Sequence, residues 1–289
     1  MEPPYPSLTA TWHNDTYPAI DPKGKELSQA GKTVVITGAG SGIGRATAIA
    51  FAEAGAKTLV LIGRTLSTLR ETQELIPNKE LCNTHAYACS VTDEAGMKGI
   101  ADRVGGWDVL ILNAGYTSPP GLIAQGPLDE FWKNYEANVK GIVVTAQAFI
   151  PTAKSNAAMY AMAAGSMVFP PQMTPYLGGY ETSKIAQMRV MEFLAAENPH
   201  LFVCSVHPGL VDTSIFRRAG ATPDALPMDT VTLPAHFLVW LSQPKTKFLN
   251  GKMVFANWDV DEMCAKAEEI KSTEMLTLGY VGWPFMKTS

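Results

Sequence analysis

The stretch that decides the fold runs Thr33-Val34-Val35-Ile36-Thr37-Gly38-Ala39-Gly40-Ser41-Gly42-Ile43-Gly44. Its first part, Thr33–Thr37, is apolar or β-branched and predicts a buried strand. The glycines that follow permit positive φ and let the backbone approach a ligand closely, and a helix is expected from Ile43. A strand, a glycine-rich turn and a helix in this order predict a pyrophosphate site. A turn with only a structural role is the alternative, since the spacing is GxxxGxG and not GxGxxG.

The alternation of short apolar runs with longer amphipathic stretches continues along the chain. This pattern is typical of strand–helix units and a parallel sheet. The expected strands are Thr33–Thr37, Thr58–Ile62, Val109–Leu112, Ala157–Ala163, Leu201–Val206 and Lys252–Phe255. The expected helices include Ile43–Ala54, Phe131–Phe149 with a break near Gly141, Tyr180–Ala196 and Val231–Leu241. The predicted fold class is α/β: one Rossmann-like domain with a doubly wound parallel sheet.

Three segments are expected, of which residues 31–258 form the dinucleotide-binding domain. Residues 1–30 contain Pro3, Pro4, Pro6, Pro18 and Pro22 without apolar periodicity, which predicts an irregular arm that either packs on the surface or stays mobile. Residues 259–289 are expected to form a C-terminal helix and an aromatic tail with Gly282-Trp283-Pro284-Phe285. Because exposed Trp and Phe forgo burial energy, the tail is expected to dock on its own subunit or a neighbour.

Composition excludes several function classes. The 289 residues are 46% hydrophobic and 17% charged, with a formal net charge of -4. Lys and Arg are scattered, so neither nucleic acid nor anionic lipid is an expected partner. No apolar run reaches the length of a membrane span, the N-terminus lacks the pattern of a secretory signal, and a cytoplasmic location is expected. Cys82, Cys89, Cys204 and Cys264 lack metal-ligand spacing, which predicts free thiols in a reducing compartment and no metal site.

The strongest sign of chemistry is the pair Tyr180 and Lys184 in Gly-Tyr-Glu-Thr-Ser-Lys. Residues at i and i+4 share a helix face, so the spacing predicts an ammonium beside a phenol. A neighbouring cation makes the phenol usable as an acid or base near neutral pH. The pair alone occurs often by chance, but downstream of a dinucleotide-type turn it predicts a redox active site.

The residue that follows the second strand indicates which dinucleotide binds. NAD-specific sites place an acid about twenty residues past the turn, where it bonds the ribose 2′-hydroxyl. This chain has Gly63-Arg64-Thr65 there. No carboxylate repels a 2′-phosphate and Arg64 can pair with one, so NADP(H) is predicted over NAD(H). A solvated Arg64 is the alternative.

Five motifs in order identify a family. They are Thr37-Gly38-xxx-Gly42-x-Gly44, Asn113-Ala114-Gly115, Asn138 in Asn138-Val-Lys-Gly141, Tyr180-xxx-Lys184, and Pro208-Gly209 with Thr213. Over roughly residues 32–257 the chain resembles the short-chain dehydrogenases/reductases. The segments His207–Thr213, Ala256–Asp261 and Gly282–Phe285 resemble reductases of fungal secondary metabolism within that family.

The resemblance implies roles for individual residues. Tyr180 would be the proton donor or base, Lys184 its modulator and ribose contact, and Asn138 the anchor of a water that completes a proton relay. Together, the motifs assign the cofactor to Gly38, Ser41, Gly42, Ile43, Gly44, Arg64, Ser90, Asn113, Ala114, Gly115, Tyr180, Lys184, Pro208, Gly209 and Thr213. The segment 210–227 resembles the family's substrate-binding loop, with Tyr116 and its neighbours on the opposite wall.

The chain departs from the family pattern at two places. The catalytic serine normally lies thirteen residues before the tyrosine, where this chain has Met167. Ser166 is the nearest hydroxyl and is the predicted oxyanion donor, with Thr174 and Tyr176 as fallbacks. If Ala163-Ala164 aligns with the family's Ser-Ser, the serine has been lost. At the second place, Ser90 stands where relatives carry Asp.

The predicted function is hydride transfer between NADP(H) and a carbonyl, imine or alcohol carbon of a small secondary-metabolite substrate. Members of this family commonly form homodimers or homotetramers through their later helices, and the same is expected here. One alternative is a non-redox cyclase or isomerase in natural-product biosynthesis, built on the same scaffold. Another is a non-catalytic dinucleotide sensor, against which the intact Tyr180–Lys184 pair argues.

Overall fold

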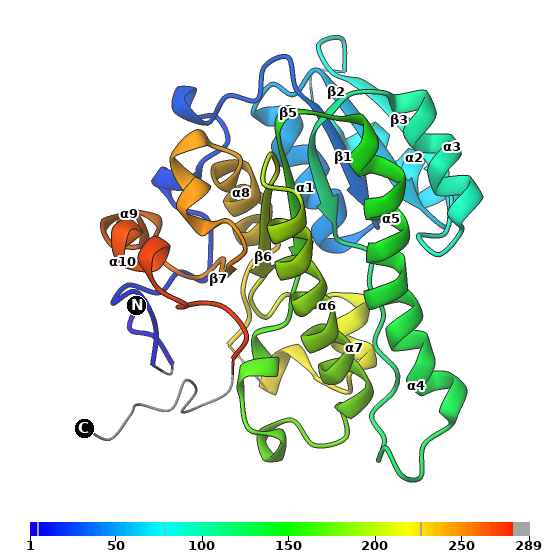
Figure 1. The fold of residues 1–289 in the computed structure, drawn as a ribbon, viewed down its shortest axis with the longest axis vertical. Coiled ribbons are helices and arrows are strands. Elements are labelled where there is room, and N and C mark those ends of the chain that lie inside the picture. The colour runs from blue at the N-terminus through cyan, green and yellow to red at the C-terminus, as the bar shows by residue number, and fades with distance from the viewer. Residues whose placement is uncertain (5, 78, 226, 280–289) are drawn as a thin grey trace.

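The computed structural model describes residues 1–289 except 5, 78, 226 and 280–289. Its centre is a seven-stranded parallel sheet in the order β3-β2-β1-β4-β5-β6-β7 (Figure 1). The strands are β1 Thr33–Thr37, β2 Thr58–Gly63, β3 Asn83–Ala88, β4 Trp107–Leu112, β5 Ala153–Met162, β6 Phe202–His207 and β7 Met253–Phe255.

Helices connect and cover the strands. The α-helices are α1 Gly42–Glu53, α2 Leu66–Leu75, α3 Glu94–Val104, α4 Leu128–Tyr135, α5 Gly141–Phe149, α6 Gly178–Glu197, α7 Ser214–Arg218, α8 Thr232–Leu241, α9 Val260–Ala265 and α10 Ala267–Ser272. A π-helical turn, Glu136–Lys140, joins α4 to α5. The single-domain Rossmann-like fold predicted from the sequence is confirmed.

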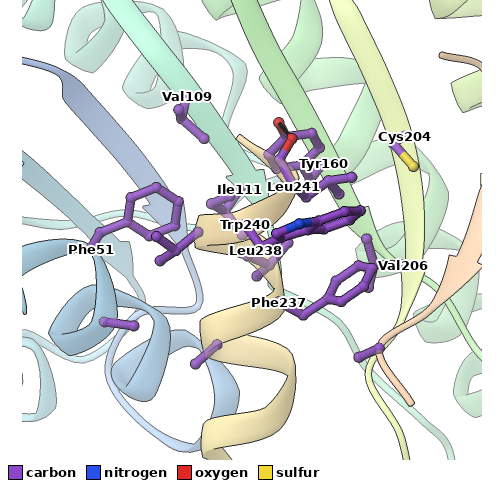
Figure 2. Close-up of a cluster of buried hydrophobic side chains, with 14 of the residues drawn as sticks. Phe51, Val109, Ile111, Tyr160, Cys204, Val206, Phe237, Leu238, Trp240 and Leu241 are labelled. Atoms are coloured by element: carbon purple, nitrogen blue, oxygen red, sulfur yellow. Dashed lines mark hydrogen bonds between the residues drawn. The ribbon is translucent and has the colours of Figure 1, made fainter. Parts of the chain in front are cut away.

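The two faces of the sheet carry separate apolar layers. One layer joins β1, β2, β4, β5 and β6 to side chains of α1, α2 and α8. The other joins the opposite side of the strands to α3, α5 and α6. Figure 2 shows the first layer, where Phe237 and Trp240 of α8 lie among strand side chains such as Ile111 and Val206. Both α8 rings are fully buried, and eight of the ten residues of this mostly apolar helix are buried, so the helix is part of the core.

The strand order indicates at which edge of the sheet a ligand binds. β1 lies between β2 and β4, so the connections leave β1 and β4 toward opposite sides. In open α/β sheets ligands bind beyond the carboxyl ends of strands at such a switch point. The glycine turn follows β1 at Gly38, and Asn113 follows β4 at the same edge.

All six predicted strands are present, with small differences at their ends. β3 was not predicted, because its sequence Asn-Thr-His-Ala-Tyr-Ala is mostly polar and it lies at the edge of the sheet. The predicted helix Phe131–Phe149 is divided by the π-helical turn just before Gly141. A Cβ at Gly141 would lie 2.6 Å from Val91 Cγ2, so close packing explains the glycine.

The N-terminal arm packs against the end of the domain, next to α9 and α10 (Figure 1). The backbone N–H groups of Ala10 and Thr11 donate to the carboxylate of Glu262. Trp12 pairs with Trp258 in an isolated antiparallel bridge, and both rings are buried. Of the two expected outcomes, packing and mobility, the structure shows packing. The predicted aromatic tail, Gly282–Phe285, lies outside the described residues.

Candidate active site

The glycine turn closes tightly over the end of β4. Gly38 and Gly42 have φ of 66° and 51°, in the left-handed region where a side chain is strained. A Cβ at Gly44 would overlap the carbonyl oxygen of Gly38, and one at Gly38 would lie 2.8 Å from Asn113 Nδ2. The glycines therefore leave the backbone of the turn uncovered by side chains next to the N-terminus of α1. Binding of a pyrophosphate requires such an accessible backbone.

Asn113 ties the ends of β1 and β4 together. Its Nδ2 donates to the carbonyl oxygens of Thr37, at 3.0 Å, and of Gly38, at 3.2 Å. The backbone N–H groups of Asn113 and Ala114 donate to Thr37 Oγ1. This network holds the glycine turn in register with the segment after β4, so both border the same cleft.

A cleft with a volume of about 790 Å³ opens at this edge of the sheet. Its lining includes ten of the residues assigned to a cofactor from the sequence: Gly38, Ser41, Gly42, Ile43, Arg64, Ser90, Asn113, Ala114, Gly115 and Thr213. Lining residues that the sequence did not assign to the cofactor include Cys89, Thr92, Lys133, Glu136 and Ile215. The size and the bare glycine backbone fit an extended dinucleotide.

The two arginines near the glycine turn have different surroundings. Arg45 on α1 donates to the carbonyl oxygen of Gly40 at 2.6 Å and pairs with Glu71 at 2.9 Å, so its guanidinium is engaged. Arg64 lines the cleft, is exposed, and forms no side-chain hydrogen bond or ion pair within the described residues. Of these two arginines, Arg64 is therefore the one whose guanidinium is available for a ligand phosphate.

Ser90 lines the cleft where the family carries an acid. Its Oγ is 2.8 Å from Thr92 Oγ1 and accepts from the backbone N–H of Thr92 at 3.3 Å. The hydroxyl pair retains donor and acceptor capacity toward a ligand.

Tyr180 and Lys184 occupy the first turns of α6 on one face, as the spacing predicted. Lys184 Nζ lies 5.7 Å from the centre of the Tyr180 ring. Two of its three protons are donated, to the carbonyl oxygen of Met162 at 2.7 Å and to Gln187 Oε1 at 2.9 Å. Neither residue lines the cleft itself, but a Cβ on Gly115 would lie 3.8 Å from Lys184 Nζ. Lys184 therefore adjoins the cleft wall at Gly115.

The electrostatics of the pair differ from the sequence-based expectation of a phenol made more acidic. Burial raises the pKa of Tyr180 above its ordinary value, and the adjacent Glu181 carboxylate raises it further. Burial lowers the pKa of Lys184 to about 7, against a smaller opposite effect of Glu181. Within the described residues the Tyr180 phenol therefore stays protonated at neutral pH, and the Lys184 ammonium titrates near pH 7.

Asn138 is buried in the π-helical turn, a feature often found at functional sites. Its Nδ2 donates to the carbonyl oxygen of Tyr116 and to Ser183 Oγ, at 2.8 and 2.9 Å. Its Oδ1 accepts from the N–H of Tyr116 at 2.8 Å. Both amide protons are used, so Asn138 links the segment after β4 to α6. A water bound at Asn138 must therefore donate to the amide oxygen or bind to the backbone.

Ser166, the predicted oxyanion donor, lies a few residues after the end of β5. β5 ends at Met162, Ala163 and Ala164 follow, and Ser166 lies in a short 3₁₀ turn, Gly165–Val168. His207 fixes this turn, because its Nδ1 accepts from the N–H of Gly165 at 2.9 Å. Burial lowers the pKa of His207 to about 4, so the ring is neutral at pH 7. Burial raises the pKa of Glu181, and the Ser166 hydroxyl acts in the opposite direction. The catalytic role of Ser166 stays a prediction.

Five of the predicted cofactor residues are not among the lining residues of the cleft: Gly44, Tyr180, Lys184, Pro208 and Gly209. A Cβ at Gly209 would overlap the carboxylate of Asp229. Thr213, by contrast, lines the cleft and caps α7, accepting from the N–H of Phe216 at 3.3 Å. The Pro-Gly turn therefore shapes the chain before Thr213 rather than bordering the cleft.

A cluster of three polar side chains that was not predicted from the sequence connects the segment after β4 to α4 and α7. Its members are Tyr116, Glu130 and Arg218, and it is called the polar latch below. Tyr116 donates to Glu130 Oε2 at 2.5 Å, and Arg218 donates to the Tyr116 oxygen at 3.0 Å while stacking over its ring. Because Arg218 ends α7 and Glu130 lies on α4, this latch spans the substrate side of the site. Arg218 and Tyr116 lie 102 positions apart in the chain. The sequence alone therefore gave no sign that they pair.

The described residues contain no group of three or more His, Cys, Asp or Glu that could hold a metal. In the same part of the chain no helix is long and apolar enough to span a bilayer.

Comparison with known proteins agrees with this geometry. A family model described as short chain dehydrogenase matches residues 32–224. The chain is 32% identical to the short chain dehydrogenase mpl6 of Monascus purpureus, over 96% of this chain and 98% of that protein.

Solved structures show the same fold. L-sorbose reductase from Gluconobacter frateurii, complexed with NADPH and L-sorbose, is 25% identical with a TM-score of 0.70, covering 80% of this chain and 96% of that one. 3-Ketoacyl-(acyl-carrier-protein) reductase from Brucella melitensis, complexed with NADH, is 23% identical with a TM-score of 0.70, covering 79% and 97%.

Proposed function

The chain belongs to the short-chain dehydrogenase family, and we therefore propose that it is an NADP(H)-dependent oxidoreductase. Its reaction would transfer hydride between the nicotinamide and a carbonyl, imine or alcohol carbon of a small organic substrate. The observation that carries the proposal is the Tyr180–Lys184 pair on one face of α6, next to a glycine-lined cleft of dinucleotide size.

Arg64 supports NADP(H) over NAD(H). Its guanidinium lies in the cleft wall without a protein partner among the described residues, just past the end of β2. A 2′-phosphate would give it the bidentate partner that this geometry favours. Solved structures of the fold carry either NADPH or NADH, so the argument depends on Arg64 alone.

The proton chemistry supports reduction of a carbonyl. When bound, the dinucleotide supplies or accepts the hydride. Tyr180 keeps its proton at neutral pH because burial disfavours the phenolate, and it can donate that proton to the developing alkoxide. Lys184, with its pKa near 7, can then return a proton toward Tyr180. Asn138 holds the segment after β4 against α6 while this occurs.

Besides the polar latch, the segments on the substrate side carry exposed apolar side chains. Loop 117–127 and the segment before α6 meet where the N–H of Gly121 donates to the carbonyl oxygen of Tyr176 at 2.8 Å. Exposed large apolar side chains collect on these segments and on α4: Leu122, Ile123, Leu128, Trp132, Val168, Met173 and Tyr176. Such a rim suits a sizeable apolar or aromatic carbonyl compound, which agrees with the proposal of a secondary-metabolite substrate.

The test is turnover of a carbonyl panel that includes the aromatic diketone 9,10-phenanthrenequinone, followed by loss of NADPH absorbance. Wild type should oxidise NADPH, whereas Tyr180→Phe should reduce kcat by at least about a hundredfold and leave NADPH affinity unchanged. Equal turnover by the two proteins would refute the assignment of Tyr180.

No observation in the structure favours the cyclase or isomerase. The same assay separates it from a reductase, because product formation without stoichiometric loss of NADPH would replace the redox proposal with the non-redox one.

A further inference from the structure

The two ends of segment 210–227 meet at one buried acid. Asp229, just after the segment, is 8% exposed, and its Oδ2 accepts from the backbone N–H of Leu210 at 2.6 Å. The backbone N–H of Asp229 donates in turn to the carbonyl oxygen of Leu210 at 2.8 Å. Val211 and Asp229 also form an isolated parallel bridge. These contacts close the segment into a loop, whose base is formed by Leu210 and Asp229.

The position of the cleft residue Thr213 depends on the same carboxylate. Gly209 has a φ of 88°, and a Cβ there would overlap Asp229 Oδ2, so the chain enters the loop directly over this acid. Thr213 lies only three positions after Leu210 and lines the cleft. A Cβ at Gly42 would lie 3.3 Å from Thr213 Cγ2. The bond between Leu210 and Asp229 therefore sets where Thr213 lies against the glycine turn.

The second carboxyl oxygen of Asp229 faces the N-terminal arm. Its Oδ1 accepts from Asn14 Nδ2 at 2.6 Å and from Nδ2 of Asn257, which follows β7, at 3.0 Å. The carbonyl oxygen of Asn14 accepts from the backbone N–H of Thr230 at 2.9 Å. Asp15 Oδ1 accepts from the Thr230 hydroxyl at 2.6 Å. The arm, 215 positions from Asp229 in the sequence, is thus bonded to the base of the loop.

We propose that Asp229 is a positioning residue, held by Asn14 of the N-terminal arm, which fixes the base of loop 210–227 and so places Thr213 for the cofactor. The inference rests on the proposed function, which assigns the cleft to NADP(H). Neither Asp229 nor Asn14 lines the cleft, so both act through the loop. The two oxygens of an aspartate accept on two sides at once, whereas an asparagine has one acceptor oxygen. Asp229→Asn can therefore keep the bond to Leu210 or the bonds to the arm side, but not both.

Limited trypsin digestion of the ligand-free protein tests the restraint without turnover. Arg217 and Arg218 are exposed in the loop, so cleavage after them reports its opening. In Asp229→Asn this cleavage should be at least about tenfold faster than in wild type, with little change at other sites, because cleavage follows the population of the open form. Asp261→Asn, an exposed acid on α9, is the matched control and should behave as wild type. An unchanged rate in Asp229→Asn, or an equal rise at every site, would overturn the proposal.

Binding and kinetics connect the restraint to the site. Asp229→Asn should weaken NADPH binding and raise the KM for 9,10-phenanthrenequinone, each by about three- to tenfold, because the loop is less often in place. Its kcat should stay within about twofold of wild type, since the reacting groups on α6 are untouched. A fall in kcat with unchanged KM and unchanged NADPH affinity would contradict a positioning role.

The contribution of the arm is measured with Asn14→Ala. This variant should speed cleavage after Arg217 and Arg218 about threefold, and it should add nothing in an Asp229→Ala background if Asn14 acts through Asp229. Effects that multiply would overturn the role of Asn14. Asn14 is only partly buried, so its variant still decides the question if the Asp229 variants do not fold. Failure of wild type to bind NADPH would refute the proposed function, whereas the ligand-free digestion would still decide whether Asp229 restrains the loop.

Discussion

Lys184 and Tyr180 show how burial and charge compete at single residues. A cation beside a phenol favours the phenolate, yet burial and the Glu181 carboxylate act in the opposite direction on Tyr180. Lys184, 5% exposed, itself loses proton affinity. Desolvation is therefore the larger effect on both members of the pair, and near pH 7 it leaves the tyrosine protonated and the lysine titrating.

The pKa of Lys184 predicts a pH dependence of stability. Between pH 7 and 10.5 the unfolded chain binds a proton at this lysine that the folded chain does not, so the stability of wild type rises with pH there. Relative to Lys184→Met, wild type should gain about 1.4 kcal/mol in free energy of unfolding per pH unit in that window. Urea unfolding at pH 7.5 and 9.5 measures the difference. The exposed Lys140→Met is the control, and curves of equal slope for wild type and Lys184→Met would contradict the account.

Arg64 predicts cofactor preference. Arg64→Ala should weaken NADPH binding about 10- to 100-fold, the value of a charge-assisted pair of about 1.5–3 kcal/mol, and leave NADH binding unchanged. Fluorescence titration with both dinucleotides gives the ratio. Arg70→Ala, an exposed arginine on the neighbouring α2, should alter neither. Equal losses for the two dinucleotides would place the 2′-phosphate elsewhere.

At the scale of elements, the latch between Tyr116, Glu130 and Arg218 joins short α7 to α4 across the substrate side. Because α7 is only five residues long, few other contacts hold it. The latch therefore restrains the segment that the resemblance assigns to substrate binding.

Arg218→Ala should release this segment. We expect faster limited proteolysis within residues 210–227 and a KM for the carbonyl substrate raised several-fold, with global stability changed by less than about 0.5 kcal/mol. Arg217→Ala, which removes the neighbouring exposed pair with Asp212, provides the comparison. Unchanged proteolysis and KM in Arg218→Ala would show that the latch does not restrain the loop.

On the scale of the whole molecule, the outer face of α5 and α6 is exposed and carries an apolar groove. An apolar groove of about 420 Å³ lies between α5 and α6, lined by Val143, Ile150, Val190, Phe193 and Leu194 among others. Phe193 is 60% exposed at its edge. This supports the expected homodimer or homotetramer formed through the later helices.

Phe193→Glu should lower the oligomeric state, because a charge buried between two copies lacks a partner. Light scattering after size exclusion measures the mass of wild type and variant, with Trp132→Glu on α4 as an exposed aromatic control. A monomeric wild type, or a variant of unchanged mass, would remove this face from the interface.

Much of the architecture could be predicted because it follows from local pattern. The apolar run Val34–Thr37 predicts a strand, and the glycines that follow predict a turn and the start of a helix. The polar edge strand β3 and the π-helical turn around Asn138 could not, since each depends on tertiary contacts. At the site, the motif residues could be named, but the burial of Glu181, 8% exposed, could not, because a charged residue next to Tyr180 in the sequence gives no sign of being buried in the fold.

The central claim is that the glycine-lined cleft holds NADP(H) with its nicotinamide toward Tyr180. A crystal structure of the protein with NADP⁺ tests it most directly. The account predicts the 2′-phosphate beside Arg64, the pyrophosphate on the backbone of the glycine turn, and the nicotinamide ring next to the Tyr180 hydroxyl. A nicotinamide ring bound away from Tyr180, or a cleft empty at saturating NADP⁺, would contradict it.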